Sequence, residues 1–231
     1  NIYKTLSMNL KQIAGIALML ILFAQISNAQ RTVTELNSGW KFYKGNSEQA
    51  FQKVFDDSGW QQVSVPHDWA IEGPFIADGD GNTGKLPWKG EGWYRNKITF
   101  NKSDNGKRLY LLFDGIMAFP KVYINGKLAG KWDYGYNSFY IDITDFVDFN
   151  SENILAIHVD TRKHDSRWYP GAGICRKVQL IAVNPVYVDL WGTYITTPVL
   201  KPHFADVRTE TTVKNSSPAE MKIMVRNTIY S

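Results

Sequence analysis

The feature that most constrains this chain is a recurring pattern of short runs in which apolar and polar residues alternate. Within residues 154–160, for example, Leu155, Ile157 and Val159 fall on one face. A period of two is typical of a β-strand with one buried face, whereas an amphipathic helix repeats every 3.6 residues. No stretch after residue 29 has a convincing 3.6-residue apolar period. The pattern therefore predicts an all-β chain.

Turn residues separate these runs. Asn125-Gly126 lies between two of them, and Asn-Gly is the strongest short signal for a hairpin. Aromatic residues, which favour strands, make up 14% of the chain. We expect strands over residues 92–100, 107–113, 121–124, 127–130, 138–143, 154–160 and 178–183. Several short strands at regular spacing favour a β-sandwich of the jelly-roll, galactose-binding-like kind.

Asn184-Pro185 marks a predicted domain boundary, because proline cannot continue a central strand. Three further strands are expected after it, over residues 186–197, 205–214 and 219–228. An immunoglobulin-like sandwich needs about seven strands and about 100 residues. We therefore predict a jelly-roll domain over residues 30–184 and an incomplete immunoglobulin-like sandwich over residues 185–231. The alternative is a short hairpin that completes the first sandwich.

The first 29 residues have the pattern of a secretory signal peptide. Lys11 precedes an apolar run from Ile13 to Phe23, and Ser27-Asn28-Ala29 places small residues at the positions that a signal peptidase reads. The run is about a dozen residues long, whereas a membrane span takes about 20. We expect cleavage after Ala29 and export to the periplasm or the extracellular space, with no membrane attachment after cleavage.

Charge and metal-binding residue types exclude several classes of protein. The net charge of +4 falls to +2 without the two lysines of the signal peptide, since 24 basic and 22 acidic residues remain. The two signs are interspersed, so nothing indicates a nucleic-acid surface. One Cys and four His give neither a disulfide framework nor a Cys-rich zinc site. The acidic loop from Asp78 lacks the Gly and Glu of an EF-hand, because Thr83 and Lys89 stand there. We predict no metal and no cofactor.

Two loops combine carboxylates with tryptophan, and one of them also has an arginine. Carbohydrates need this combination, because their C–H faces pack on aromatic rings and their hydroxyls bind charged groups. Proline or glycine bounds both loops, and loops are where binding residues concentrate. The candidate sugar-binding residues are Asp165, Arg167 and Trp168 in one loop and Asp68 and Trp69 in the other.

Most of these candidates also have a structural interpretation. Asp165 can be a solvated loop residue, and Asp68 can lock a turn by bonding nearby backbone N–H groups. Trp69 and Trp168 can pack in the core. We expect core packing for the tryptophans that lie in or just before strands, which are Trp40, Trp60 and Trp93.

Four segments carry a resemblance to a known family. They are Pro66-His67-Asp68-Trp69, Gly92-Trp93-Tyr94-Arg95, Asn125-Gly126, and Arg167-Trp168-Tyr169-Pro170-Gly171 with Gly173-Ile174 and Arg176. In this order and spacing they resemble the N-terminal sugar-binding domain of glycoside hydrolase family 2, especially exported bacterial β-galactosidases. The resemblance runs from about Leu36 to Ala182, and residues from Pro185 onward are similar to the start of the family's immunoglobulin-like domain. Cys175 departs from the aromatic residue expected there.

The resemblance implies an architecture and a role for this chain. Family members have a jelly roll, an immunoglobulin-like domain and then a TIM barrel, and two glutamates of the barrel perform a retaining cleavage. Nothing in the sequence matches the barrel, so we expect no catalytic residue here and a downstream barrel in the parent chain. In the family, an acidic residue shortly before the Gly-Ile-x-Arg segment contacts sugar hydroxyls, and Asp165 is the best match.

We therefore expect the N-terminal part of a β-galactosidase-like enzyme that acts on terminal β-linked sugars, with this part shaping the sugar pocket. β-Glucuronidases and β-mannosidases share the scaffold, so the resemblance leaves the sugar open. Homo-oligomerisation of the full enzyme also stays open. The alternatives are a free-standing secreted carbohydrate-binding module and a structural sandwich without a ligand.

Overall fold

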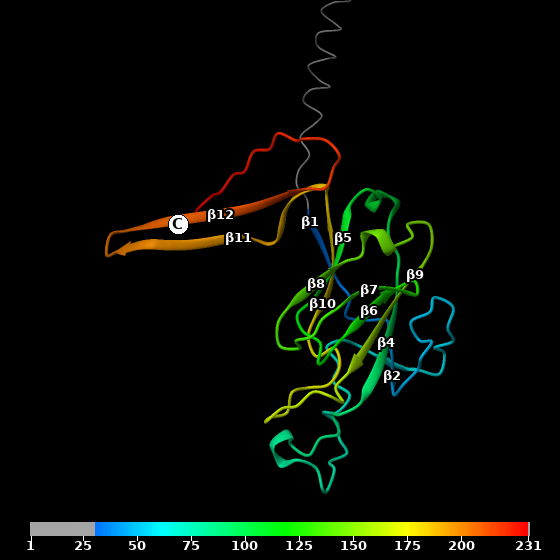
Figure 1. Cartoon of the computed structure of the whole chain (residues 1–231). Coiled ribbons are helices and arrows are strands. Elements are labelled where there is room, and N and C mark those ends of the chain that lie inside the picture. Colours follow the sequence, from blue (N-terminus) through cyan, green and yellow to red (C-terminus); the bar gives the residue numbers. More distant parts are fainter. Residues whose placement is uncertain (1–30, 231) are drawn as a thin grey trace, which may run out of the picture.

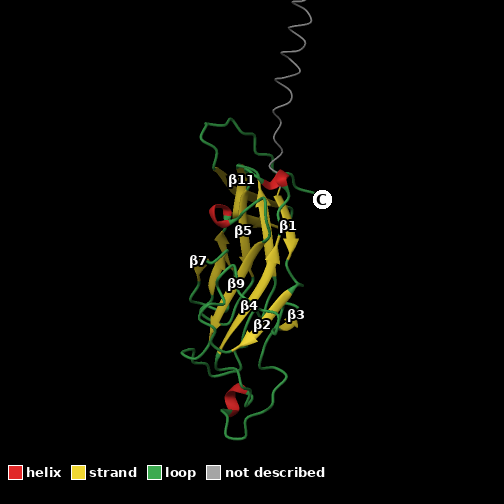
Figure 2. Ribbon diagram, turned by 90° about the vertical axis from the view of Figure 1, so that its right-hand side faces the viewer, coloured by secondary structure: helices red, strands yellow, loops and turns green. Residues whose placement is uncertain are grey.

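The computed structural model describes residues 31–230, so the predicted signal peptide lies outside the described residues. Two antiparallel sheets pack as a β-sandwich, and a long two-stranded hairpin leaves one end of it (Figure 1). The hairpin leaves the upper end of the sandwich, and the loop that contains the 3₁₀ helix Gly81–Thr83 lies at the lower end (Figure 2). The predicted all-β fold class is confirmed.

The larger sheet has six strands in the order β3-β2-β4-β9-β6-β7. Their bounds are Trp40–Lys44 (β2), Gln61–Val63 (β3), Glu91–Ile98 (β4), Lys121–Ile124 (β6), Lys127–Lys131 (β7) and Asn153–Asp160 (β9). The smaller sheet has the order β1-β10-β5-β8. Its strands are Arg31–Glu35 (β1), Arg108–Phe113 (β5), Phe139–Asp142 (β8) and Val178–Val183 (β10). Every neighbouring pair in these two sheets is antiparallel.

The remaining elements are the hairpin and three short 3₁₀ helices. The hairpin pairs Val186–Lys201 (β11) with Phe204–Asn215 (β12), also antiparallel. The 3₁₀ helices are Gly81–Thr83 (η1), Lys102–Asp104 (η2) and Thr144–Phe146 (η3). Among the described residues, the chain therefore has no α-helix.

The strands expected before residue 184 are all present, with bounds shifted by at most two residues. The Asn-Gly turn is also confirmed, because Asn125 and Gly126 have φ angles of +50° and +85°, as a two-residue turn between strands requires. Three strands were absent from the expected series. β1 is exposed along its whole length, and β3 has only three residues. Neither strand therefore has the alternating apolar pattern that marks a buried face in a sequence. β2, the third, is also short.

The main core lies between the two sheets. The predicted inner face of β9 is confirmed, since Leu155, Ile157 and Val159 are fully buried. Burying a side chain of this size stabilises the fold by about 1.5–3 kcal/mol. Trp40 and Trp93 are buried as expected, and Trp60 is half-buried against a second cluster on the outer face of the larger sheet.

A buried ion pair holds residues 45–60 against that outer face. Arg95 is only 2% exposed, and its Nε donates to Oδ2 of Asp57 at 2.8 Å, while Nη1 donates to two backbone carbonyls. Lys41 Nζ lies 2.7 Å from the other carboxylate oxygen. Burial opposes ionisation of Asp57, but the hydrogen bonds and charges of Lys41 and Arg95 outweigh it and lower its pKa. The arginine of the Gly92–Arg95 segment is therefore structural.

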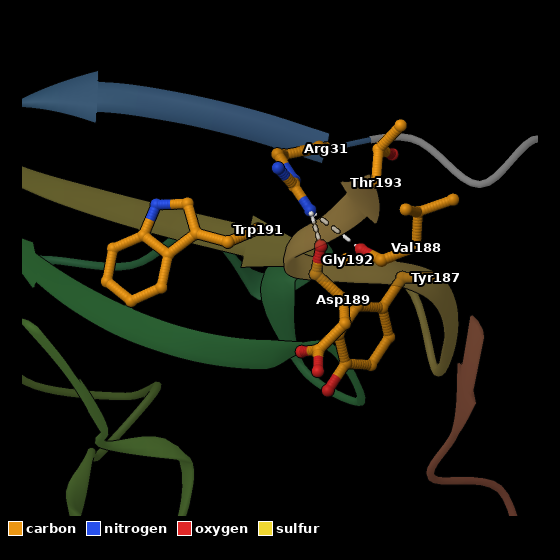
Figure 3. A pocket seen from close by; sticks show the side chains of 7 residues that line it. All are labelled: Arg31, Tyr187, Val188, Asp189, Trp191, Gly192 and Thr193. Carbon is orange, nitrogen blue, oxygen red and sulfur yellow. Dashed lines mark hydrogen bonds between the residues drawn. The ribbon is translucent and has the colours of Figure 1, made fainter. Parts of the chain in front are cut away.

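The hairpin is attached to the sandwich at the start of β11. Tyr187 is buried against the outer face of the smaller sheet, and its hydroxyl lies 2.5 Å from that of Tyr110. Nη2 of Arg31 donates to the carbonyl oxygens of Val188 and Asp189 at 2.6 and 3.0 Å (Figure 3). Side chains from β1 and β11 line a cavity at this junction (Figure 3).

The strand predicted over residues 219–228 is wrong. These residues form no strand and are exposed. Met221, Ile223 and Val225 alternate with other residues as a strand would, but a strand also needs a neighbour to bond with. Within the described part of the chain, β11 and β12 pair only with each other. The domain bounds at residues 184 and 185 stay a prediction.

Candidate functional site

Two loops meet at the end of the sandwich opposite the hairpin. Residues 84–90 lead into β4, and residues 161–172 follow β9 (Figure 1). Because β4 pairs with β9 in antiparallel register, the start of one strand lies beside the end of the other. The buried Thr161 joins the loops: its hydroxyl donates to the carbonyl oxygen of Trp88 at 2.7 Å, and its N–H donates to that of Gly90 at 2.8 Å.

The second loop lines a hollow of about 470 Å³, which we call the Trp168 hollow. Its lining residues are Tyr136, His164, Asp165, Ser166, Arg167 and Trp168. Nε1 of Trp168 donates to the hydroxyl of Tyr136 at 2.9 Å, which fixes the indole. Trp168 is nevertheless 58% exposed. A fixed and exposed indole is suited to stacking against a ligand.

His164 packs among aromatic rings in this hollow. Its ring centre lies 5.9 to 6.3 Å from the centres of three rings, those of Trp88, Phe119 and Tyr136. Burial lowers the pKa of His164, and the charge of Lys89 lowers it further. Nε2 of the imidazole is buried and has no hydrogen-bond partner within residues 31–230. His164 therefore contributes to the packing of the hollow, and its buried Nε2 is not exposed to a ligand.

An ion pair stands at the rim of the Trp168 hollow. Nζ of Lys89 lies 2.9 Å from Oδ1 of Asp165, whose side chain is 96% exposed. The hydrogen bond and the charge of Lys89 lower the pKa of Asp165. Exposed ion pairs contribute little to stability. The pair therefore acts mainly by holding the Asp165 carboxylate near the hollow. Arg167 is also exposed at this rim.

The structure places the other predicted pair, Asp68 and Trp69, along a separate cavity. Trp69 is 9% exposed, and its ring stacks on Phe42 with centres 5.8 Å apart. Oδ1 of Asp68 accepts from the hydroxyl of Tyr169 at 2.7 Å and from the N–H of Ala70 at 3.0 Å. These contacts are those of a core residue for Trp69, and Asp68 stabilises a turn by accepting from the N–H of Ala70. Contact of either residue with a sugar stays a prediction.

A packed unit beneath the second loop explains several motif residues. Gly173 has a φ of +115°, and a Cβ there would lie 2.2 Å from the hydroxyl of Tyr94, so only glycine fits. Burial raises the pKa of Tyr94 well above its usual range, so its protonated hydroxyl can donate to Nδ1 of His67, 2.7 Å away. Burial likewise raises the pKa of the Cys175 thiol to about 12. These residues position the loop.

Three residues of the site were not predicted from the sequence. Lys89 and Tyr136 lie on loops far from residue 165, and only the fold brings them to it. His164 directly precedes Asp165, so the adjacent His-Asp pair was the one available signal for it.

Residues 31–230 contain no group of three or more His, Cys, Asp or Glu side chains that could hold a metal ion. In the acidic loop, Asp80 caps η1, and its carboxylate accepts from the N–H of Asn82 at 2.9 Å. In the same part of the chain, no helix combines the length and the apolar character needed to cross a bilayer.

Residues 40–168, more than half of the chain, match the family model described as glycosyl hydrolase 2 galactose-binding domain-like. The chain belongs to this family. The resemblance inferred from the four segments is thereby confirmed. The matched range includes the first three segments and extends to Trp168 in the hollow.

Three similar proteins have related names. A protein named Beta-galactosidase BoGH2A from Bacteroides ovatus is 39% identical over 198 residues, which are 84% of this chain and 23% of that protein. A putative beta-glucuronidase from Formosa agariphila is 35% identical, over 87% of this chain and 20% of its own length. The crystal structure of a beta-glycosidase from Bacteroides vulgatus matches with a TM-score of 0.76 and 30% identity, over 81% of this chain and 25% of that one.

The chain thus spans about a quarter or less of the length of these relatives. They are larger family members in which the matched region is one part.

Proposed function

We propose that this chain is the N-terminal part of a retaining glycoside hydrolase, β-galactosidase-like, that removes terminal β-linked sugars. The observation that carries the proposal is the Trp168 hollow, with an ionised carboxylate at its rim, in a chain whose relatives are named as glycosidases. Retaining cleavage needs two carboxyl groups about 5 Å apart, and in this family they belong to a barrel. We assign no catalytic residue to the chain itself.

The role of this part is to shape one wall of the sugar pocket. A sugar ring stacks its C–H face on Trp168, which the bond to Tyr136 holds in place. Asp165 accepts a hydrogen bond from a sugar hydroxyl, and Arg167 donates one to a sugar oxygen. These are binding roles, because the reacting atoms lie with the catalytic carboxylates.

The proposal includes the layout and the location of the parent protein. It begins with a signal peptide over residues 1–29, continues with the jelly roll over residues 30–184, and enters an immunoglobulin-like domain at residue 185. The catalytic barrel follows downstream, and the protein is exported to the periplasm or beyond the cell. The mass of the natural secreted protein tests this layout, since a barrel adds about 250 residues.

Removing Trp168 or Asp165 tests the role of the hollow. In the natural full-length protein, we expect Trp168→Ala and Asp165→Ala each to lower kcat/KM for its glycoside at least tenfold. Both residues are exposed, so the melting temperature should not change. Trp191→Ala is the matched control, because Trp191 is 61% exposed but lies on the hairpin. Unchanged turnover in both hollow variants would favour a sandwich that only braces its neighbours.

A further inference from the structure

The aromatic surface of the candidate site continues past the Trp168 hollow onto the loop of residues 132–137. The ring centre of Tyr134 lies 5.6 Å from that of Tyr136, and the ring centre of Tyr136 lies 6.4 Å from that of Trp168. Tyr134 and Trp168 are each 58% exposed. We call these three residues the aromatic ledge. The ledge joins two loops that are distant in the sequence, and only one of its ends lines the hollow.

The loop that carries Tyr134 is held firmly from behind. A Cβ on Gly135 would lie 2.7 Å from the sulfur of Met117, so the backbone here lies directly on the core. Trp132 stacks on Phe139 with centres 5.3 Å apart and planes 7° apart. Nε1 of Trp132 also donates to Asn137 at 2.9 Å. The ledge is therefore formed before any ligand arrives, which reduces the entropy lost on binding.

Tyr134 itself does little for the packing of the domain. Its one ring contact among the described residues is with Tyr136. Trp132, on the same loop, instead packs on the core. An exposed aromatic group that adjoins other exposed rings marks a binding surface more often than a chance exposure. Tyr134 extends the surface of the hollow without being needed to build it.

We propose that the aromatic ledge binds a second sugar ring, so that the substrate is an oligosaccharide or a glycan chain and Tyr134 determines this preference. The inference rests on the proposed function of the Trp168 hollow and extends it by one sugar unit. The chemistry of the surface supports a carbohydrate occupant. Aromatic rings take the C–H faces of sugars, and the charged Lys89, Asp165 and Arg167 beside them suit a ligand rich in hydroxyls.

The test compares substrates of two lengths in the natural full-length protein. The probes are methyl β-glycosides of galactose and of glucuronic acid, and trisaccharides that end in the same two sugars. A methyl group is too small to stack on Tyr134, whereas the second ring of a trisaccharide can. We expect Tyr134→Ala to lower kcat/KM for the trisaccharide about five- to tenfold and to leave the methyl glycoside unchanged. Tyr134→Phe should behave as wild type, because stacking does not need the hydroxyl.

Tyr194→Ala is the matched control, since Tyr194 is a similarly exposed tyrosine on β11. An equal effect of Tyr134→Ala on both substrate lengths, or no effect on the trisaccharide, overturns the proposal. If Trp168→Ala lowers kcat/KM for both substrates while Tyr134→Ala lowers it for neither, the proposed role of the Trp168 hollow is supported and that of the aromatic ledge is overturned. If the wild-type protein cleaves no probe, the proposed function fails. Trisaccharide binding by the same protein then decides: weaker binding in Tyr134→Ala but not in Tyr194→Ala supports the ledge, and any other result overturns it.

Discussion

The sandwich and the hairpin of this chain are both antiparallel, yet they bury their apolar residues to very different extents. In the sandwich, two sheets face each other, and side chains as large as Trp40, Tyr94 and Phe113 are fully buried. In the hairpin, Tyr194, Ile195, Leu200 and Phe204 are all exposed. Beyond its base, the hairpin has no second layer to pack against within residues 31–230, so alternation alone cannot bury a face. The difference shows that burial of apolar residues here depends on layering and not on strand formation alone.

The base of the hairpin behaves differently from its tip. Tyr187 and Leu190 are buried against Tyr110 and Ile181 on the smaller sheet. Lys214 Nζ also lies 2.8 Å from Asp189 across the two hairpin strands. The base of the hairpin therefore packs on the sandwich, which serves as its second layer. We expect substitutions in the sandwich to change global stability, and substitutions at the hairpin base to change mainly the attachment of the hairpin.

The largest expected effect comes from Gly173→Ala in the sandwich. The new methyl group would meet both Tyr94 and the carbonyl oxygen of His67 at less than 3 Å, with a φ that alanine avoids. We expect a loss of about 3 kcal/mol in the free energy of unfolding, measured by urea denaturation. The variant should also disturb the loop of residues 161–172.

Gly59→Ala is the control for that substitution. A Cβ on Gly59 meets no atom within 4 Å, so its stability should change by no more than about 0.5 kcal/mol. If the two variants were equally stable, Gly173 would not be the tight contact that we describe.

The second effect comes from the buried ion pair on the outer face of the larger sheet. Asp57→Asn leaves the buried guanidinium of Arg95 without its negative partner, and we expect a loss of about 2 kcal/mol at pH 7. Folding lowers the pKa of Asp57, so its contribution is complete above the unfolded pKa of about 3.9. The contribution disappears as the pH falls through the lower folded pKa, so wild type and variant should converge in acid.

Urea denaturation at a series of pH values measures this convergence. Asp78→Asn, at an exposed aspartate of the 70–86 loop, is the control and should match wild type throughout. A stability gap between Asp57→Asn and wild type that stays constant down to pH 2 would show that the charge of Asp57 is not the cause.

Most strands of the sandwich could be predicted from the sequence, because their buried faces follow local patterns of apolar and polar residues. The alternation in β9 and the Asn-Gly turn each fix a strand without reference to the rest of the molecule. β1 and residues 219–228 show the limit. β1 is a strand because β10 lies beside it, although its own residues are all exposed. Residues 219–228 have a strand pattern but no neighbouring strand within the described residues. Pairing partners, unlike alternation, are not local.

Only part of the candidate site could be predicted from the sequence, because some of its residues are brought together by contacts that are not local. Asp165, Arg167 and Trp168 lie in one continuous loop, and the sequence singled them out together. Lys89 and Tyr136 reach that loop through the pairing of β4 with β9 and through the packing of the 132–137 loop, respectively. Trp69 shows a different limit, since its loop setting left sugar binding and core packing both open, and only the structure shows that its ring stacks on Phe42.

The smallest expected effect is at the hairpin base, where Tyr187→Phe removes the hydroxyl that bonds to Tyr110. A buried hydrogen bond of this kind contributes about 1 kcal/mol, and the ring contacts of Tyr187 remain. We expect amide hydrogen exchange to become faster in β11 and β12 and to stay unchanged in β4 and β9. Tyr194→Phe is the control, because that tyrosine is exposed on β11 and should change neither region. Faster exchange in β4 and β9 as well would mean that the hairpin and the sandwich unfold as one unit. The sandwich would then not be stable independently of the hairpin that packs on it.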